Sequence, residues 1–333
     1  MNFKFAAVAA AVAATLALAA CGGGGNDGNG FAPIGGIPSV PAPAPAPEPV
    51  PEPEPAPEPA PAVSTFMYEQ VPYPVDTAGF LNDLNTEGAK GFMFLSALTA
   101  PASGTGANVY VKTGDTTYVY ETKGEPADTA AFLLQANEAG GRGYHWVGAD
   151  SVNGVSVMLY RKDSNTSATY SYRTDAAATN KTDFIAGSNA QGADGYFNVS
   201  PFFLFGGANV AIFEKSSDAG STFSYEVKDD AADTNGALGQ FEEAGARGFR
   251  FRGPAMFGNI FVKDLSQSTT FTFQAVPGQS TLEADIEKSN AMGAEGFAFV
   301  GPLVVGGENR TYYYKASNCT GRVLCMPTGP FGL

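Results

Sequence analysis

The chain has 333 residues and carries 33 acidic against 19 basic side chains, so its formal net charge is −14 at pH 7. A surface of this sign repels nucleic acid and anionic headgroups, and we expect no nucleic-acid partner. The single His, His145, excludes metal sites built from several His, and the sequence has no HExxH, G-x-S-x-G or phosphate-loop pattern.

The N-terminus has the form of an export signal. In MNFKFAAVAAAVAATLALAAC one Lys precedes an Ala/Val/Leu run and a small-residue exit, and the run is too short for a membrane span. Its last four residues, LAAC, resemble the lipobox of bacterial lipoproteins. The resemblance implies a signal peptide over residues 1–20, acyl chains such as palmitate on Cys21, and a membrane anchor through them. Because Gly22 and not Asp follows, it also implies the outer membrane, with the side that the protein faces left open.

Two segments of biased composition follow the signal. Residues 21–40 are Gly-rich and are interpreted as a flexible tether, whereas residues 41–63 alternate Pro with small or acidic residues and predict a polyproline II stalk. At about 3.1 Å per residue, this stalk reaches about 70 Å. Pro-rich runs can also be ligands for aromatic grooves. The regular alternation beside a lipid anchor favours a spacer.

One motif occurs five times in residues 64–316, as NTEGAKGF, NEAGGRGY, NAQGADGY, EEAGARGF and NAMGAEGF. The spacings between successive second glycines are 52, 52, 53 and 48 residues. Such a period indicates a repeat architecture. We call this region the head, and residues 317–333 the C-terminal tail. The head divides into units 1 to 5, over residues 65–116, 117–168, 169–221, 222–269 and 270–316.

Each unit is predicted to run in the order strand, helix, strand, strand. It opens with a Thr- and aromatic-rich strand such as TYVYE, and it closes with two strands such as GYHWV and VMLYRK. Between them lies a helical segment such as ADTAAFLLQAN, which Asp76, Asp128 or Ser280 can cap in units 1, 2 and 5. Aromatic residues two apart, such as Tyr118 and Tyr120, share a sheet face, which we expect to pack under the helix.

A pair of glycines follows each predicted helix. We expect the first glycine to take the left-handed C′ position and the second to turn the chain into the next strand. Phosphate loops lie at helix N-termini, and these pairs lie at a C-terminus, which argues against phosphate binding. The pairs are Gly88 and Gly91, Gly140 and Gly143, Gly192 and Gly195, Gly245 and Gly248, and Gly293 and Gly296.

The repeated unit resembles a small bacterial domain of unknown function whose helix ends in an LNELGAEGWELV-like string before a hairpin that ends in Lys-Arg. NAMGAEGFAFV in unit 5 is the closest copy, and Phe or Tyr stands where that family often has Trp. The resemblance implies an α+β fold of tandem βαββ repeats and no particular activity. Units of about 52 residues are marginal alone. We therefore expect a compact pseudo-symmetric arrangement, either a propeller-like ring or an open repeat array.

Cys319 and Cys325 are the two cysteines that remain besides Cys21. In an exported protein they are predicted to form one small disulfide. A metal site would need further His or Cys ligands nearby, and the flanking sequence has none. We expect the disulfide to hold the C-terminal tail in place.

A basic residue recurs at the end of each third strand. If the units close into a ring, these cations lie on one rim and form a candidate site for an anionic polymer. The alternative is that they protect strand edges and pair with acids such as Glu121 and Glu226. The set is Lys112, Arg161, Lys215, Lys263 and Lys315.

Other candidate chemistry is sparse. Strand alternation predicts that His145 points away from the aromatic core, and we interpret it as a surface side chain. Acidic stretches such as KDDAADTNG have the composition of turns. They could bind calcium weakly, although none has the EF-hand spacing. No other cofactor is expected.

The sequence therefore predicts a stalked envelope lipoprotein that is not an enzyme and whose head binds or scaffolds an envelope protein or glycan. This prediction depends on the similarity of the units, none of which carries a distinct set of polar residues. Two alternatives stay open. The repeats could self-associate into a surface layer, or carboxylates from several units could hydrolyse envelope polysaccharide.

Overall fold

The computed structural model describes residues 65–99, 104, 106–218 and 220–327. The predicted signal peptide, tether and stalk, including Cys21, lie outside these residues. None of the helices in the described ranges combines the length and the apolar character that crossing a bilayer requires.

The described part of the head is α+β, with a three-stranded antiparallel sheet in each of the five units. The third strand of each unit is the middle strand of its sheet, and it pairs with both others. The first strands are β1 (Met67–Pro72), β4 (Tyr118–Gly124), β7 (Tyr170–Ala176), β10 (Phe223–Lys228) and β13 (Thr270–Pro277). The second strands are β2 (Phe92–Thr99), β5 (His145–Val152), β8 (Phe197–Phe205), β11 (Arg250–Ala255) and β14 (Ala298–Val305). The third strands are β3 (Gly106–Lys112), β6 (Val155–Asp163), β9 (Ala208–Ser216), β12 (Gly258–Asp264) and β15 (Glu308–Ser317).

One helix connects the first and second strands of every unit, as predicted. These helices are α1 (Thr77–Ala89), α2 (Thr129–Gly141), α3 (Lys181–Ala193), α4 (Thr234–Ala246) and α5 (Leu282–Ala294). Asp76 and Asp128 cap α1 and α2 through their carboxylates, which confirms two of the predicted caps. Ser280 does not cap α5. The hydroxyl of the next residue, Thr281, accepts the N–H of Ala284 instead.

The first glycine of each pair does not have the role that the sequence predicts. Gly88 lies within α1, and a Cβ on it would lie 2.3 Å from the carbonyl oxygen of Tyr118 in unit 2. The left-handed C′ residue is the second glycine, Gly91, with φ of +89°. The first glycine therefore allows close packing between units. The other first glycines, Gly140, Gly192, Gly245 and Gly293, would meet the next unit at 2.1–2.3 Å, and the other second glycines, Gly143, Gly195, Gly248 and Gly296, also have positive φ.

The Asn that opens the repeated motif joins each helix to the next unit. Asn85 in α1 accepts the N–H of Tyr120 at 2.9 Å and donates to its carbonyl at 3.2 Å. In unit 4, Glu242 takes the Asn position and accepts the N–H of Phe273. The Asn side chain thus forms the pair of hydrogen bonds that a neighbouring strand would form with the first strand of the following unit.

A Tyr hydroxyl makes a second repeated contact between units. The second strand of unit 2 has a register shift between Trp146 and Gly148, and the Trp146 N–H donates to the hydroxyl of Tyr172 in unit 3 at 2.6 Å. Equivalent bonds join Phe94 to Tyr120 and Asn198 to Tyr225. In units 1, 2 and 3 the bulge therefore offers a backbone donor that the following unit satisfies, whereas Phe273, at the Tyr position of unit 5, has no hydroxyl.

The aromatic residues pack on helices of two different units. Phe132 of α2 is fully buried and lies against Trp146 of its own second strand, with ring centroids 5.5 Å apart. It also contacts Tyr172 of the next unit's first strand, at 6.4 Å. The second-strand aromatics therefore lie under their own helix, as expected, whereas the first-strand aromatics pack against the helix of the preceding unit.

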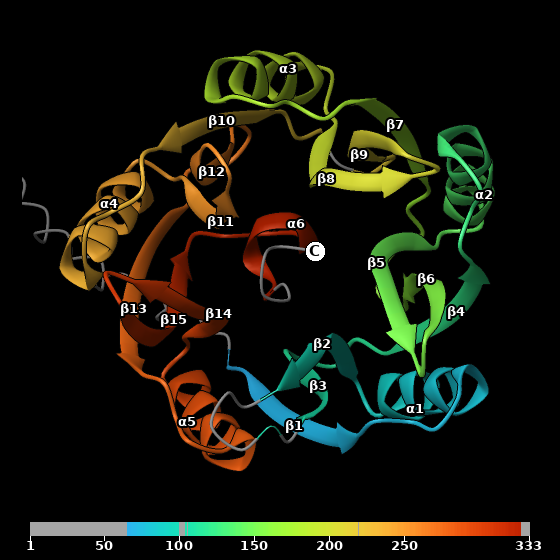
Figure 1. Ribbon diagram of the computed structural model, residues 1–333, viewed down its shortest axis with the longest axis horizontal. Helices are drawn as coiled ribbons and strands as arrows, with labels where there is room; N and C mark the ends of the chain where they lie inside the picture. The colour runs from blue at the N-terminus through green and yellow to red at the C-terminus, as the bar shows by residue number, and fades with distance from the viewer. Residues whose placement is uncertain (1–64, 100–103, 105, 219, 328–333) are drawn as a thin grey trace, which may run out of the picture. The chain divides into compact units, whose positions relative to one another are not determined.

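Unit 5 makes these same contacts with unit 1. The Phe66 N–H donates to the carbonyl of Gly293 at 3.1 Å, and Asn290 bonds the backbone of Tyr68. The Tyr68 hydroxyl in turn accepts the Phe299 N–H at 2.8 Å. In Figure 1 the helices α1–α5 lie outside the sheets. The short helix α6 (Arg322–Cys325) lies on the inner side of the sheets.

Candidate functional site

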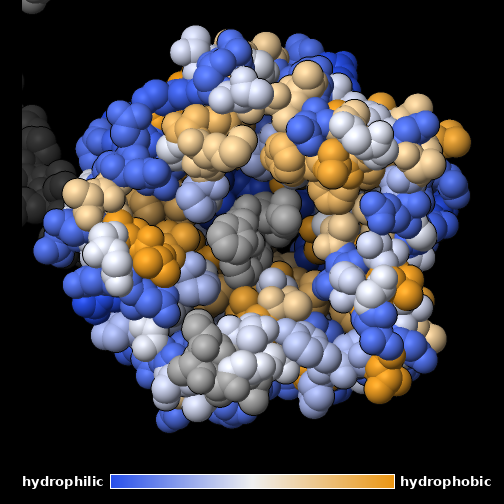
Figure 2. All heavy atoms as spheres, in the orientation of Figure 1, coloured by the Kyte–Doolittle hydropathy of each residue, from blue (hydrophilic) through white to orange (hydrophobic). Residues whose placement is uncertain are grey.

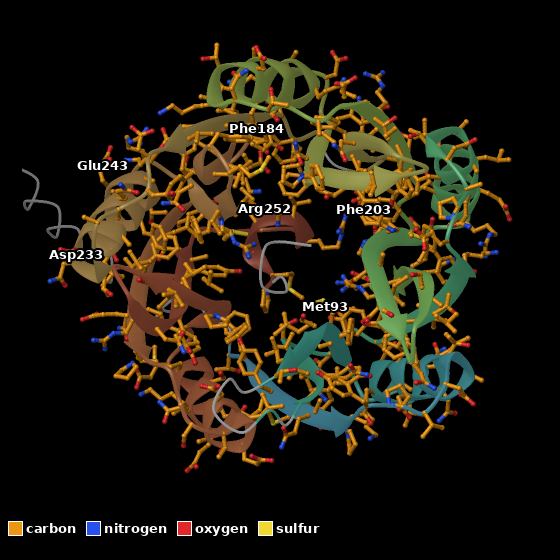
Figure 3. The ribbon with its side chains drawn as sticks, viewed as in Figure 1. Met93, Phe184, Phe203, Asp233, Glu243 and Arg252 are labelled. Carbon is orange, nitrogen blue, oxygen red and sulfur yellow. A yellow bond between two sulfur atoms is a disulfide. The ribbon has the colours of Figure 1, made fainter. Side chains whose placement is uncertain are left out.

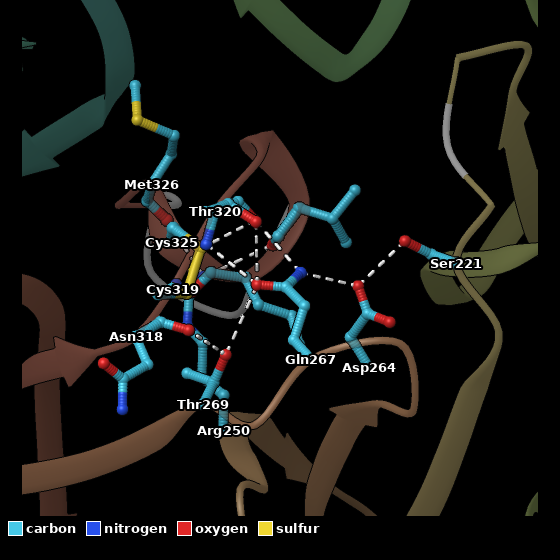
Figure 4. The surroundings of a disulfide bond; sticks show 12 residues. Ser221, Arg250, Asp264, Gln267, Thr269, Asn318, Cys319, Thr320, Cys325 and Met326 are labelled. Carbon is cyan, nitrogen blue, oxygen red and sulfur yellow. Dashed lines mark hydrogen bonds between the residues drawn. A yellow bond between two sulfur atoms is a disulfide. The ribbon is translucent and has the colours of Figure 1, made fainter.

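The α6 segment, residues 318–327, is held by side chains from several units. Arg250 of unit 4 donates to the carbonyls of Leu324 and Met326 at 3.1 and 2.9 Å. The side chain of Gln267 accepts the N–H of Thr320 at 2.8 Å (Figure 4). Arg322 reaches units 2 and 3 through the contacts described below. The segment is thus a structural part of the head.

The predicted disulfide between Cys319 and Cys325 is present. It closes a turn around α6, and Thr269 donates its hydroxyl to the carbonyl of Asn318 beside it (Figure 4). Since Arg250 and Gln267 bind on either side of this turn, the disulfide and the hydrogen bonds act together to place the α6 segment.

Four of the five recurring basic residues, all except Arg161, bind at the ends of their own helices. Lys112 donates from Nζ to the carbonyl of Lys90, the C-cap residue of α1, at 2.9 Å, and it lies over the ring of Phe92. Lys215, Lys263 and Lys315 make the same bond in their units. In unit 2 the equivalent residue is Lys162 and not Arg161, which is buried. These lysines cap helix C-termini, which favours a structural role over an anion-binding rim.

The residues that do differ between units lie one position earlier. The residue preceding the conserved Lys is Val111, Arg161, Glu214, Val262 and Tyr314 in units 1 to 5. The residue paired opposite it on the second strand is Met93, His145, Phe197, Arg250 and Ala298. Units 2, 3 and 4 therefore gather a distinct set of charged side chains around α6. The expectation that no unit is distinguished was wrong, because the motif was compared as a whole and not position by position.

A buried ion pair lies in unit 2. The Arg161 guanidinium donates to both oxygens of Asp163, at 2.7 and 3.2 Å, and both residues are less than a tenth exposed. Although burial opposes it, Arg161 holds the pKa of Asp163 well below its usual range. Paired in this way, Asp163 stays ionised throughout the physiological pH range.

A second ion pair joins unit 3 to the α6 segment. Arg322 donates to one oxygen of the buried Glu214, and the Tyr172 hydroxyl donates to the other at 2.5 Å. Burial, together with the Glu214 charge, raises the pKa of Tyr172 well above its usual value. The Tyr172 hydroxyl also accepts the N–H of Trp146, so this pair is tied to the contact between units 2 and 3.

His145 lies between the two ion pairs and is 4% exposed, so its interpretation as a surface side chain was wrong. Its Nδ1 lies 3.3 Å from the guanidinium of Arg322 and 3.4 Å from the carbonyl oxygen of Trp146. Burial and the charges of Arg322 and Arg161 lower the pKa of His145 to about 4. His145 faces the α6 segment. The alternation of residues in its own strand could not reveal this contact.

A cavity of about 700 Å³ is lined by units 1 to 4 and by the α6 segment. Its lining includes hydroxyl, amide and carboxylate groups, among them Thr166, Ser221, Asp264 and Gln267. Asp264 accepts bonds from Ser221 and Gln267, both at 2.8 Å (Figure 4). A lining of this kind offers both donors and acceptors to a polar ligand.

The surface in Figure 2 shows apolar residues scattered among polar ones, without one dominant apolar patch on that face. Within the described residues, no group of three or more His, Cys, Asp or Glu is arranged to hold a metal ion. No family model, curated protein or solved structure matches the chain at a significant level.

Proposed function

We propose that the protein is a non-enzymatic binding module of the bacterial cell envelope and that its head takes a glycan in the cavity beside α6. The cavity carries this proposal. About 700 Å³ is within the range of ligand sites, and its walls supply hydroxyls, amides and carboxylates from four units. Such walls suit a hydroxyl-rich ligand, which needs many donors and acceptors at fixed positions.

The proposed function also includes a lipid anchor at Cys21. The LAAC sequence at Cys21 supports cleavage and acylation there, and Gly22 supports sorting to the outer membrane. The Pro-rich residues 41–63 then hold the head away from the bilayer. Metabolic labelling with a palmitate analogue should label the wild-type protein and leave Cys21→Ala unlabelled. Label retained in Cys21→Ala would contradict lipidation at this residue.

We also propose that the five units form a closed, propeller-like ring. The proposal is supported by the bond from Phe66 to Gly293, and by the bonds of Tyr68 with Asn290 and Phe299, which repeat contacts of other unit boundaries. In an open array, the Phe66 and Tyr68 amides would face solvent. Hydrogen exchange should therefore find these two amides as protected as the equivalent Tyr120 amide, which bonds Asn85. Rapid exchange at both would favour the open array.

Binding is tested in the cell and with the purified lipoprotein. In-cell crosslinking followed by mass spectrometry should recover envelope glycan or its carrier with the wild-type protein, and less of it with the delocalised Cys21→Ala variant. Calorimetry with the detergent-solubilised protein and defined cell-wall or capsular oligosaccharides should show saturable heat without turnover. Crosslinks only between copies would favour a surface layer, and release of sugar products would favour a hydrolase.

Two substitutions locate the glycan site. Gln267→Ala removes lining donors and acceptors but also loosens Thr320, so it is compared with Thr166→Val, which leaves the α6 segment untouched. Both variants should weaken oligosaccharide binding if the cavity is the site. Unchanged affinity in Thr166→Val and Gln267→Ala would place binding elsewhere.

A further inference from the structure

A second, smaller pocket lies against the α6 segment and shares Arg322, Val323 and Met326 with the large cavity. Its volume is about 80 Å³, and its lining includes His145, Arg161, Arg252 and Arg322, with the rings of Phe197 and Trp146. Figure 3 shows Arg252 reaching from β11 toward α6. A water molecule occupies about 30 Å³ of liquid. The pocket therefore has room for a group of two or three water volumes, the size of a carboxylate or phosphate.

Every charged side chain in this lining is a hydrogen-bond donor. The three guanidinium groups can only donate, and the described residues that line the pocket include no Asp or Glu. The acids that pair with Arg161 and Arg322, namely Asp163 and Glu214, lie outside the lining. A pocket built from donors and aromatic rings selects an acceptor that carries negative charge.

The imidazole of His145 adds a polar group without a partner to this pocket. Its Nε2 is buried and has no hydrogen-bond partner. The nearest acid oxygen, Oδ1 of Asp163, is 3.7 Å away and is already bonded by Arg161. A buried polar nitrogen without a partner costs stability, so a ligand group that forms a hydrogen bond with it gains that free energy.

Comparison of the units shows that the arginine is specific to this place. The position of Arg252 is occupied by Leu95, Val147, Val199 and Val300 in the other four units. Burial and the neighbouring Arg250 lower the pKa of Arg252 to about 9, because both disfavour its charge. The guanidinium lies over the ring of Phe197 and donates to the carbonyl of Val199 at 3.3 Å, which holds it at the wall of the pocket.

We propose that this pocket, at His145, Arg161, Arg252 and Arg322, binds the oxyanion of a ligand, a carboxylate or a phosphate. The proposal does not rest on glycan binding in the larger cavity. Because Arg322 lines both cavities, an anionic group in the small pocket lies next to any ligand held in the large one. Binding requires no covalent step and no cofactor.

The single His allows a direct test with the whole lipoprotein in detergent. Protein labelled with ¹⁵N-histidine gives imidazole signals from His145 alone. Titration with inorganic phosphate, and separately with acetate, at constant ionic strength set by chloride, should shift the Nε2 signal in a saturable way. Saturation by phosphate only, or by acetate only, supports the pocket and names the chemistry of its ligand.

Two matched variants separate the pocket from general charge effects. Arg252→Val restores the residue type of the other units, and it should weaken binding about tenfold or more through the loss of a charge-assisted hydrogen bond. Arg173→Val removes the same charge from an exposed site in unit 3 and should leave the affinity unchanged. The proposal is overturned if neither anion gives a saturable shift, if chloride competes equally, or if both variants lose affinity alike.

Discussion

The two glycines of each pair are required for different reasons, although they are only three residues apart. Gly143 adopts φ of +85° and ends the helix, whereas Gly140 leaves room for the backbone of Tyr170 in the next unit. The two requirements are independent, because one concerns the conformation of the glycine itself and the other concerns a neighbour. Only the first can be read from local sequence rules.

Substitution of adjacent glycines in α2 tests this difference. Gly140→Ala puts a Cβ 2.1 Å from the carbonyl oxygen of Tyr170, so we expect a loss of about 1–3 kcal/mol in the free energy of unfolding. Gly141→Ala meets nothing within 4 Å and should be neutral or slightly stabilising. Thermal melts of the two variants measure the effect, and equal melting temperatures would contradict the close approach.

The buried His145 predicts a pH dependence of stability. Its pKa is about 4 in the folded protein and 6.5 in the unfolded chain, so between these values only the unfolded chain takes up a proton. Stability should therefore fall as pH decreases from 6.5 to 4, by about 3 kcal/mol from this residue. Urea denaturation of the wild type and of His145→Phe, which copies Phe197 of unit 3, isolates the effect. Identical pH profiles for the two proteins would rule it out.

At the scale of elements, each helix is completed by the strand that follows it in the next unit. The motif Asn satisfies backbone groups of that strand, and the Tyr of the strand satisfies the bulge of the preceding unit. The element boundaries follow from caps and periodicity within one unit. The partners of the elements lie across a unit boundary.

Removal of one such contact between units should lower the free energy of unfolding. Asn290→Ala leaves the N–H and carbonyl of the buried Tyr68 without their partners, and we expect a loss of about 1–3 kcal/mol. Asn290→Asp retains the acceptor for the Tyr68 N–H but loses the donor, so its loss should be smaller. Chemical denaturation gives both values, and a neutral Asn290→Ala would show that unit 5 and unit 1 are joined by other contacts.

A disulfide crosslink closes the α6 segment. Replacement of Cys319 and Cys325 by Ser should cost about 2 kcal/mol, since the closed loop is short. The α6 backbone should remain in place through Arg250, which bonds its carbonyls. Hydrogen exchange of the Leu324 amide compares the two proteins. Complete loss of protection in the double variant would show that the disulfide, and not Arg250, holds the segment.

At the scale of the whole head, the interlocked units predict cooperative unfolding. The single Trp, Trp146, lies in unit 2, so its fluorescence reports on that unit, whereas far-ultraviolet circular dichroism reports on all five. Unfolding of unit 2 alone would break the bond from Trp146 to Tyr172 of unit 3, so we expect the units to unfold together. The two signals should give one midpoint in urea. Separate midpoints would indicate units that unfold independently, as in a linear repeat array.

Particular residues show how much of the structure could be predicted from the sequence. The βαββ order, the caps at Asp76 and Asp128 and the Cys319–Cys325 disulfide could be predicted, because each depends on residues close together in the chain. The burial of His145 could not, since α6 approaches it from 177 residues further along the chain. The grouping of Arg161 with the lysines failed for a related reason, because a shift of one position on a strand reverses the face.

The sequence by itself determined the period and the elements of each unit, since hydrophobic alternation and capping are local properties. It also determined the acidic charge of the head and the lipobox pattern at Cys21. Only the tertiary structure decided which charged residues meet. Units 2, 3 and 4 place His145, Glu214 and Arg250 around the α6 segment because inter-unit packing brings equivalent strand positions together. That juxtaposition depends on distances between units, which no local pattern encodes.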